Sequence, residues 1–167
     1  MRFDIITVFP EAFGSYLNAS ILKRAQERGL ISVRLHGLRK WGKGRHRQLD
    51  DKPYGGGAGM VLMAEPILRA VEAARRKLKD KGGKLRVVVL SAKGRQFNQK
   101  MAHDWVKRYD RLIIISGRYE GIDERVRRAL KAEEVSIGPY VLTDGDVAAM
   151  ALISAVSRLI PGAIKPE

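Results

Sequence analysis

Apolar and polar residues alternate along the chain with two periods, one typical of strands and one typical of helices. Short β-branched runs predict strands at 3–8, 31–35, 85–90 and 112–116, and helical spacing predicts helices at 13–28, 66–78, 98–107, 123–130 and about 147–160. Gly29 stands where the first long helix should end. Strands and helices in this order predict an α/β fold, with a mostly parallel sheet flanked by helices.

Two stretches interrupt this order and are candidates for functional loops. The first, 37–59, combines a basic run with an acidic pair and a glycine cluster. The second, 136–146, breaks an otherwise apolar segment with Gly138, Pro139 and Gly145. Loops of this length inside a compact domain usually carry function. The chain of 167 residues shows no internal repeat and no linker, so we expect residues 1–167 to form one domain.

The charge balance narrows the class of partner. The chain carries 32 Lys and Arg against 18 Asp and Glu, a net charge of +14. Such a surplus favours polyanionic partners, nucleic acid first and an anionic membrane surface second; a basic, heat-adapted surface without a partner is the alternative. The absence of Cys excludes disulfides and thiolate sites. Residues 1–10 lack the features of a signal peptide and no stretch is long enough to span a membrane, so we expect a cytoplasmic protein.

Familiar nucleotide, metal and nucleophile motifs are incomplete in this sequence. Gly37, Gly42 and Lys43 match the opening of a phosphate-binding loop, but Gly44 replaces the required Ser or Thr. The glycine cluster lacks the third glycine of the dinucleotide-binding fingerprint. The histidines share no segment, and no Ser lies in a Gly-x-Ser-x-Gly motif. We therefore expect none of these sites.

The segment 116–125, which reads Ser-Gly-Arg-Tyr-Glu-Gly-Ile-Asp-Glu-Arg, follows a buried strand and precedes a helix. It should lie at the carboxyl edge of the sheet, where open α/β sheets bind ligands. The alternative is a capped turn with Asp123 as the N-cap. Residues 91–95 repeat the arrangement, and 136–146 supply a third glycine-bearing loop. Such loops can form one backbone-lined pocket suited to an adenine or a methionine chain, or they can be three ordinary turns.

These segments carry a resemblance to a known family. Residues 5–11, 50–60, 117–125, 136–142 and 157–162 resemble, in the same order, the bacterial tRNA (guanine-N(1)-)-methyltransferases of the TrmD family. The resemblance covers the chain almost end to end. It implies a SPOUT fold, in which a parallel sheet carries a deep C-terminal trefoil knot, although chain connections rarely thread through one another.

The resemblance also implies an activity and its partners. Enzymes of this family transfer a methyl group from S-adenosylmethionine to N1 of the guanine 3′ of the anticodon in tRNA. Each active site is built from both subunits of a homodimer, and Mg²⁺ is a possible requirement. The alternative is a non-catalytic knotted dimer that binds RNA or serves as a scaffold.

Family roles can be carried over to matching positions of this chain. Arg158 corresponds to the arginine that helps stabilise charge as the guanine loses its proton. The implied cofactor-binding residues are Ser91, Gly94, Tyr119, Glu120, Gly121, Ile137, Gly138, Tyr140, Leu142 and Gly145. The implied RNA-binding residues are Arg45, His46, Arg47, Asp50, Tyr54, Gly55 and Gly56.

The sequence departs from the family pattern in the pocket loops and at its carboxyl end. Ala92 and Ala148 replace prolines, and Asp144 replaces a glycine, so the loops lose stiffness and gain a carboxylate. The family's linker, which carries the aspartate general base, and its C-terminal tRNA-binding domain are expected beyond Glu167. For residues 1–167 by themselves we expect cofactor binding and dimerisation with weak or no tRNA methylation, because the ring proton needs a base within reach.

Overall fold

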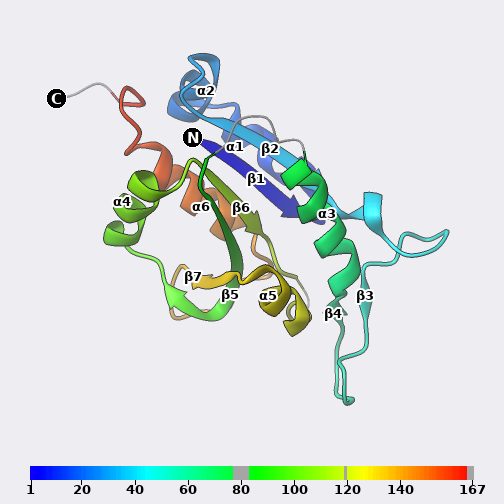
Figure 1. Cartoon of the computed structure of the whole chain (residues 1–167). Coiled ribbons are helices and arrows are strands. Elements are labelled where there is room, and N and C mark those ends of the chain that lie inside the picture. The colour runs from blue at the N-terminus through cyan, green and yellow to red at the C-terminus, as the bar shows by residue number, and fades with distance from the viewer. Residues whose placement is uncertain (77–82, 119, 165–167) are drawn as a thin grey trace.

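The computed structural model describes residues 1–76, 83–118 and 120–164. In this part of the chain, five parallel strands form one sheet with the order β2-β1-β6-β5-β7 (Figure 1). The strands are β1 (Arg2–Thr7), β2 (Ser32–Gly37), β5 (Leu85–Gln96), β6 (Arg111–Ile115) and β7 (Glu133–Ser136). The predicted α/β architecture is confirmed.

Helices cover both faces of the sheet. One face packs against α1 (Gly14–Leu17), α2 (Ser20–Glu27), α4 (Gln99–Arg108) and α6 (Asp146–Ser157). The other face packs against the 3-10 helix η2 (Leu38–Trp41), α3 (Ala64–Arg76) and α5 (Glu124–Leu130). In β6, Leu112 and Ile114 face the first layer while Ile113 and Ile115 face the second, and all four side chains are fully buried. This explains why the strand is apolar throughout.

The helix predicted at 13–28 is interrupted. A 3-10 turn, η1 (Pro10–Phe13), leads into α1, and the chain breaks at Asn18 and Ala19 before α2 begins. Ser20 adopts a left-handed conformation with φ 46°, and the Gln26 side chain donates to the Leu17 carbonyl at 2.8 Å. The side-chain amide thus satisfies a carbonyl that a continuous helix would have bonded. Residues 77–78 of the next predicted helix lie outside the described part.

Strand β5 continues beyond the predicted end at Leu90 because it pairs with a strand that the sequence pattern did not predict. Leu90 and Arg95 both pair with Val135 of β7, so residues 91–94 bulge out between them. Strand β7 begins with two glutamates, and Glu133 accepts hydrogen bonds from Arg86 at 2.6 and 3.0 Å. A short edge strand with paired charges lacks the apolar pattern on which the prediction depends.

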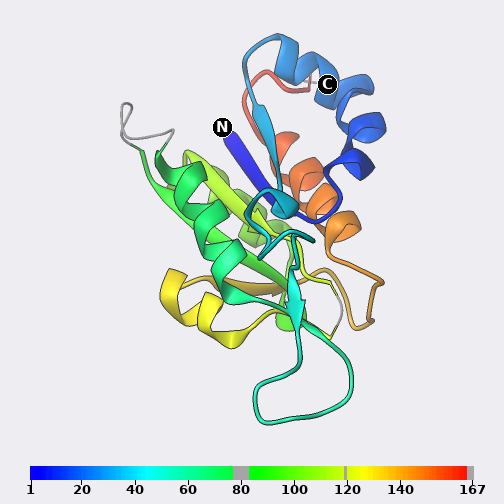
Figure 2. The same cartoon turned by 90° about the vertical axis from the view of Figure 1, so that its right-hand side faces the viewer.

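The long predicted loop 37–59 contains local structure. Lys43 and Gln48 form a bridge around a turn, and β3 (Asp50–Asp51) pairs antiparallel with β4 (Val61–Leu62). The hairpin loop between β3 and β4, residues 52–60, projects from the body of the protein in both views (Figures 1 and 2). We call β3, β4 and this loop the hairpin.

Candidate ligand pocket

Three loops meet in a pocket at the carboxyl edge of the sheet. The first loop (residues 91–94) is the bulge in β5, the second (116–123) follows β6, and the third (137–145) follows β7. All three contribute to the lining of a cavity of about 440 Å³. This volume falls in the range of small-molecule sites. The predicted convergence of the loops is therefore confirmed.

Most of the residues that the resemblance implied for cofactor binding lie around this cavity. Those that line it are Ser91, Glu120, Gly121, Ile137, Tyr140, Leu142 and Gly145. Gly94 and Gly138 are neighbours of lining residues rather than part of the lining. Tyr119 lies outside the described residues. Ala92, Asp144 and Ala148, the three departures from the family pattern, also line the cavity.

Two of the glycines are required by close backbone crossings. A Cβ on Gly94 would lie 2.5 Å from the Val135 nitrogen, so β7 crosses directly over the first loop. A Cβ on Gly145 would lie 2.9 Å from the Gly117 nitrogen, where the third loop crosses the second. Real Cβ atoms do not make such contacts. Gly145 is therefore the position in the third loop where the backbone of the second loop leaves no room for a side chain.

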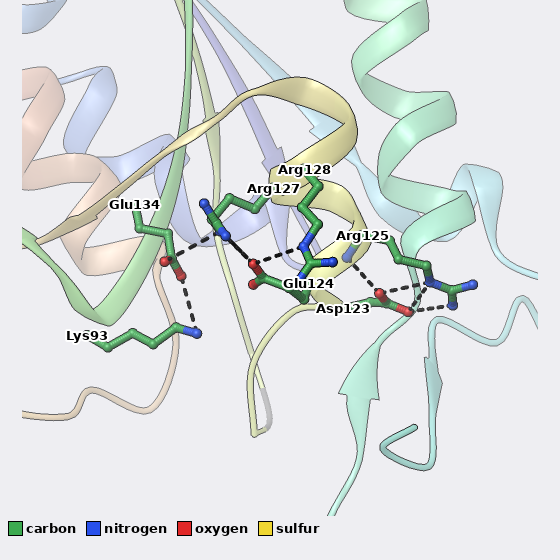
Figure 3. Close-up of polar contacts among 7 residues, drawn as sticks. All are labelled: Lys93, Asp123, Glu124, Arg125, Arg127, Arg128 and Glu134. Carbon is green, nitrogen blue, oxygen red and sulfur yellow. Dashed lines mark hydrogen bonds and ion pairs between the residues drawn. The ribbon is translucent and has the colours of Figure 1, made fainter. Parts of the chain in front are cut away.

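Charged residues that the sequence analysis did not single out also line the pocket. Figure 3 shows Glu134 of β7 between Lys93 and Arg127. Its carboxylate lies 3.7 Å from the Lys93 ammonium and 3.8 Å from the Arg127 guanidinium. Arg127 also donates to Glu124, and this hydrogen bond holds the pKa of Glu124 below its usual value. The i,i+3 spacing of Glu124 and Arg127 in a predicted helix indicates an ion pair, so this pair could have been predicted. Glu134 could not, because it belongs to the strand that was not predicted.

Asp123 both caps a helix and lines the pocket. Its Oδ1 accepts the Arg125 backbone N–H at 2.9 Å, and its carboxylate also pairs with the Arg125 guanidinium. The side-chain hydrogen bond from Arg125 lowers the pKa of Asp123 despite an opposing effect of burial. The two interpretations of this segment, capped turn and pocket loop, are therefore compatible.

A buried carboxylate anchors the start of α6 behind the pocket. Thr7 and Ser116, at the ends of β1 and β6, both donate to Asp146 Oδ1, at 2.8 and 2.6 Å. Burial raises the pKa of Asp146, the charge of Asp144 adds to this effect, and the two hydroxyl donors oppose it without cancelling it. The first turn of α6 is thereby fixed to the centre of the sheet.

The hairpin is bonded to the second loop at its base. Glu120 donates its N–H to the Met60 carbonyl at 3.0 Å, and Leu62 donates to the Gly121 carbonyl at 3.0 Å. The predicted RNA-binding residues extend away from this base. Tyr54 is fully exposed, Gly55 and Gly56 have positive φ, and Asp50 is partly buried in β3. Arg45, His46 and Arg47 lie exposed in the turn between Lys43 and Gln48.

Arg158 does not line the pocket. It caps the C-terminus of α6, whose first residue is Asp146, about 18 Å away by the rise of an α-helix. Its side chain is exposed. Spacings of four, three and four residues place Val147, Ala151, Ser154 and Arg158 on one side of α6. We call this set the α6 stripe.

Within residues 1–76, 83–118 and 120–164, no group of three His, Asp or Glu side chains is placed to hold a metal ion. None of the helices in the same ranges is long and apolar enough to cross a membrane.

Comparison with known proteins identifies the family. A family model described as tRNA (Guanine-1)-methyltransferase TrmD matches residues 1–167. The chain is 50% identical over 167 residues to a tRNA (guanine-N(1)-)-methyltransferase of Carboxydothermus hydrogenoformans and 52% identical over 170 residues to one of Chloroflexus aggregans. These alignments cover 100% of the chain but only 63% and 64% of the two relatives.

A solved structure gives the same assignment. The crystal structure of tRNA (m1G37) methyltransferase from Aquifex aeolicus superposes with a TM-score of 0.88 at 36% sequence identity. The match covers 100% of this chain and 73% of that one. The chain therefore belongs to the TrmD family of tRNA (guanine-N1)-methyltransferases.

Proposed function

We propose that the chain is the S-adenosylmethionine-binding part of a tRNA (guanine-N1)-methyltransferase. The observation that carries the proposal is the three-loop pocket. Ile137, Tyr140 and Leu142 offer aliphatic and aromatic surface suited to an adenine ring. The carboxylate of Glu120 suits the positive charge of the amino group or the sulfonium. The residues present therefore fit this cofactor.

The cofactor, when bound, supplies an electrophilic methyl group. The chain's residues would bind and orient it and exclude water from the reacting atoms. Methylation at N1 also requires a base for the ring proton. We propose that this base is an aspartate located after Glu167 in the whole protein, as the resemblance implies.

We propose that the active unit is a homodimer that pairs through the α6 stripe. Val147 is 58% exposed and Val141 in the third loop is 85% exposed, although both are aliphatic. Exposed apolar residues on adjoining elements favour a protein interface. Arg158 lies on the same stripe, so docking of a second copy would bring it to the partner's surface. This supports a role for Arg158 in the partner's pocket. We also propose a trefoil knot around the third loop, as the family resemblance implies.

We propose tRNA as the polyanionic partner, bound in the cytoplasm where tRNA is modified. The net charge of +14 and the exposed basic turn at Arg45, His46 and Arg47 support phosphate contacts. The hairpin joins this surface to the second loop through the hydrogen bonds of Met60 and Leu62. A bound RNA would therefore lie beside the pocket.

The proposal is tested by methyl transfer from labelled S-adenosylmethionine to a tRNA transcript with guanine 3′ of the anticodon. Residues 1–167 should give slow transfer, and joining them to the part of the Carboxydothermus relative that lies outside the alignment should raise the rate at least about 100-fold, as expected when a general base is supplied. A matched transcript with adenine at the target position should accept no label. No transfer by the joined protein, with cofactor binding intact, would favour the non-catalytic RNA-binding alternative.

A further inference from the structure

Asp144 is a pocket residue whose carboxylate bonds in two directions. Its Oδ1 accepts the backbone N–H of Asp146 at 2.8 Å, at the start of α6. Its Oδ2 lies 3.6 Å from a guanidinium nitrogen of Arg118 in the second loop. The Thr143 hydroxyl donates to the same Oδ2 at 3.3 Å. One side chain thus connects the third loop, the first turn of α6 and the second loop.

The backbones of the two loops are joined at the same point. Arg118 and Asp144 form an isolated antiparallel bridge, and Gly145 donates its N–H to the Gly117 carbonyl at 2.8 Å. Arg118 is in turn held by the ring of Phe9, with its guanidinium carbon 4.6 Å from the ring centroid. The second loop therefore presents a fixed cation to the third loop. Asp144 is only about one-fifth exposed, which limits screening of the pair.

From these contacts we propose that Asp144 is a positioning residue that latches the third loop onto the second and so sets the affinity of the pocket for its ligand. The Asp144 latch consists of Asp144, Arg118 and the Asp146 amide. A loop held closed before binding loses less conformational entropy when a ligand arrives. The inference rests on the proposed function only for the identity of the ligand. The ordering of the loops is a property of the chain itself.

The latch predicts a specific pattern of amide hydrogen exchange in the ligand-free protein, measured residue by residue by NMR. Asp144→Ala removes the acceptor for the Asp146 amide and the ion pair with Arg118, so the amides of Asp146 and Gly145 should both exchange faster. Asp144→Asn keeps an Oδ1 acceptor but loses the charge, so Asp146 should stay protected while Gly145 exchanges faster. The Gly145 N–H bonds to the Gly117 carbonyl and not to the Asp144 side chain, so its exchange reports how firmly the two loops are held together. Unchanged Gly145 exchange in both variants would overturn the latch.

Calorimetric titration with S-adenosylmethionine tests the effect on affinity. Asp144→Ala should weaken binding about fivefold and Asp144→Asn by less, in keeping with the loss of a helix-start acceptor and a half-buried ion pair. Glu65→Gln is the matched control, because it removes a carboxylate paired with Arg69 at 3.9 Å on α3, away from the pocket. Faster Gly145 exchange with unchanged affinity would overturn the role in binding. If the unaltered chain binds no cofactor, the proposed function fails, and the exchange pattern still decides on the latch.

Discussion

At the scale of single residues, a substitution at Gly94 tests whether β7 crosses directly over the first loop. Gly94→Ala would place a methyl group 2.5 Å from the Val135 nitrogen and 2.6 Å from the Glu134 carbonyl carbon. Because both neighbours are backbone, β7 must move, and we expect a loss of about 1 to 3 kcal/mol in the free energy of unfolding, as for other overpacked sites. Urea denaturation measures the loss, and cofactor binding should weaken with it.

Gly14 supplies the control for this substitution. It lies in α1 with helical φ and ψ, and a Cβ there would meet nothing within 4 Å. Gly14→Ala should therefore be neutral or stabilise the chain by up to about 1 kcal/mol. Equal effects of Ala at positions 14 and 94 would contradict the crossing of β7 over the first loop.

A buried ion cluster between β1 and β2 predicts a pH dependence of stability. Asp4 is fully buried, lies 2.7 Å from the His36 ring and pairs with Arg2 at 2.9 Å. Burial alone would raise the pKa of Asp4, but the hydrogen bonds and charges of His36 and Arg2 outweigh it, so the pKa is lowered. The stabilisation is therefore present above the unfolded-state pKa of about 4 and is lost as the pH falls through the lower folded-state value.

Asp4→Asn tests this account. It leaves the buried Arg2 guanidinium without its carboxylate partner, and we expect a loss of about 3 kcal/mol in the free energy of unfolding at pH 7, as when one member of a buried pair is removed. The difference from the unaltered chain should shrink as the pH is lowered towards 2. A constant difference over that range, in chemical denaturation series, would contradict the assigned charge state of Asp4.

The residue scale also shows what the sequence could predict. Glycines after buried strands indicated the pocket loops, and Asp123 was identifiable as a cap because its side chain precedes a helix. The reason for Gly94 could not be predicted, since it depends on β7, a short strand that begins with two glutamates and lacks an apolar pattern. The ion pair of Asp144 also could not be predicted, because its partner Arg118 is distant in sequence.

At the scale of elements, apolar periodicity predicted the long buried strands and failed at the edges. Strand β7 has four residues and begins with two glutamates, so the pattern contained too few apolar positions. The break between α1 and α2 arises from the backbone at Ser20, which helical spacing of apolar residues does not report. The spacing of apolar residues indicates which side of a helix or strand is buried, but it does not indicate where the backbone bends.

Helix α6 makes an element-scale prediction about assembly. Val147→Glu places a carboxylate on the α6 stripe at a position that is 58% exposed, so the monomer should stay folded. If the stripe is the dimer interface, the dissociation constant should rise at least about 100-fold, because a buried unpaired charge costs several kcal/mol. Analytical ultracentrifugation measures the change. Arg75→Glu, which puts the same charge on an exposed position of α3, should leave the dimer intact; equal dissociation in both variants would argue against the stripe.

At the scale of the whole molecule, the order of strands and helices was enough to predict a parallel sheet with its ligand loops at one edge. The strand order, with β6 between β1 and β5, was not predicted. It follows from crossovers that depend on packing between segments far apart in the sequence. The knot and the dimer remain predictions from family resemblance, while the pocket rests on the geometry of this chain.

Calorimetric titration of residues 1–167 with S-adenosylmethionine and S-adenosylhomocysteine measures whether the three-loop pocket binds the cofactor. The account predicts saturable binding of both with a dissociation constant on the order of micromolar and one site per protomer, as is usual for a preformed pocket of this size. Absence of saturable binding by the folded chain would contradict the account, because the pocket described here would then have no ligand of the proposed class.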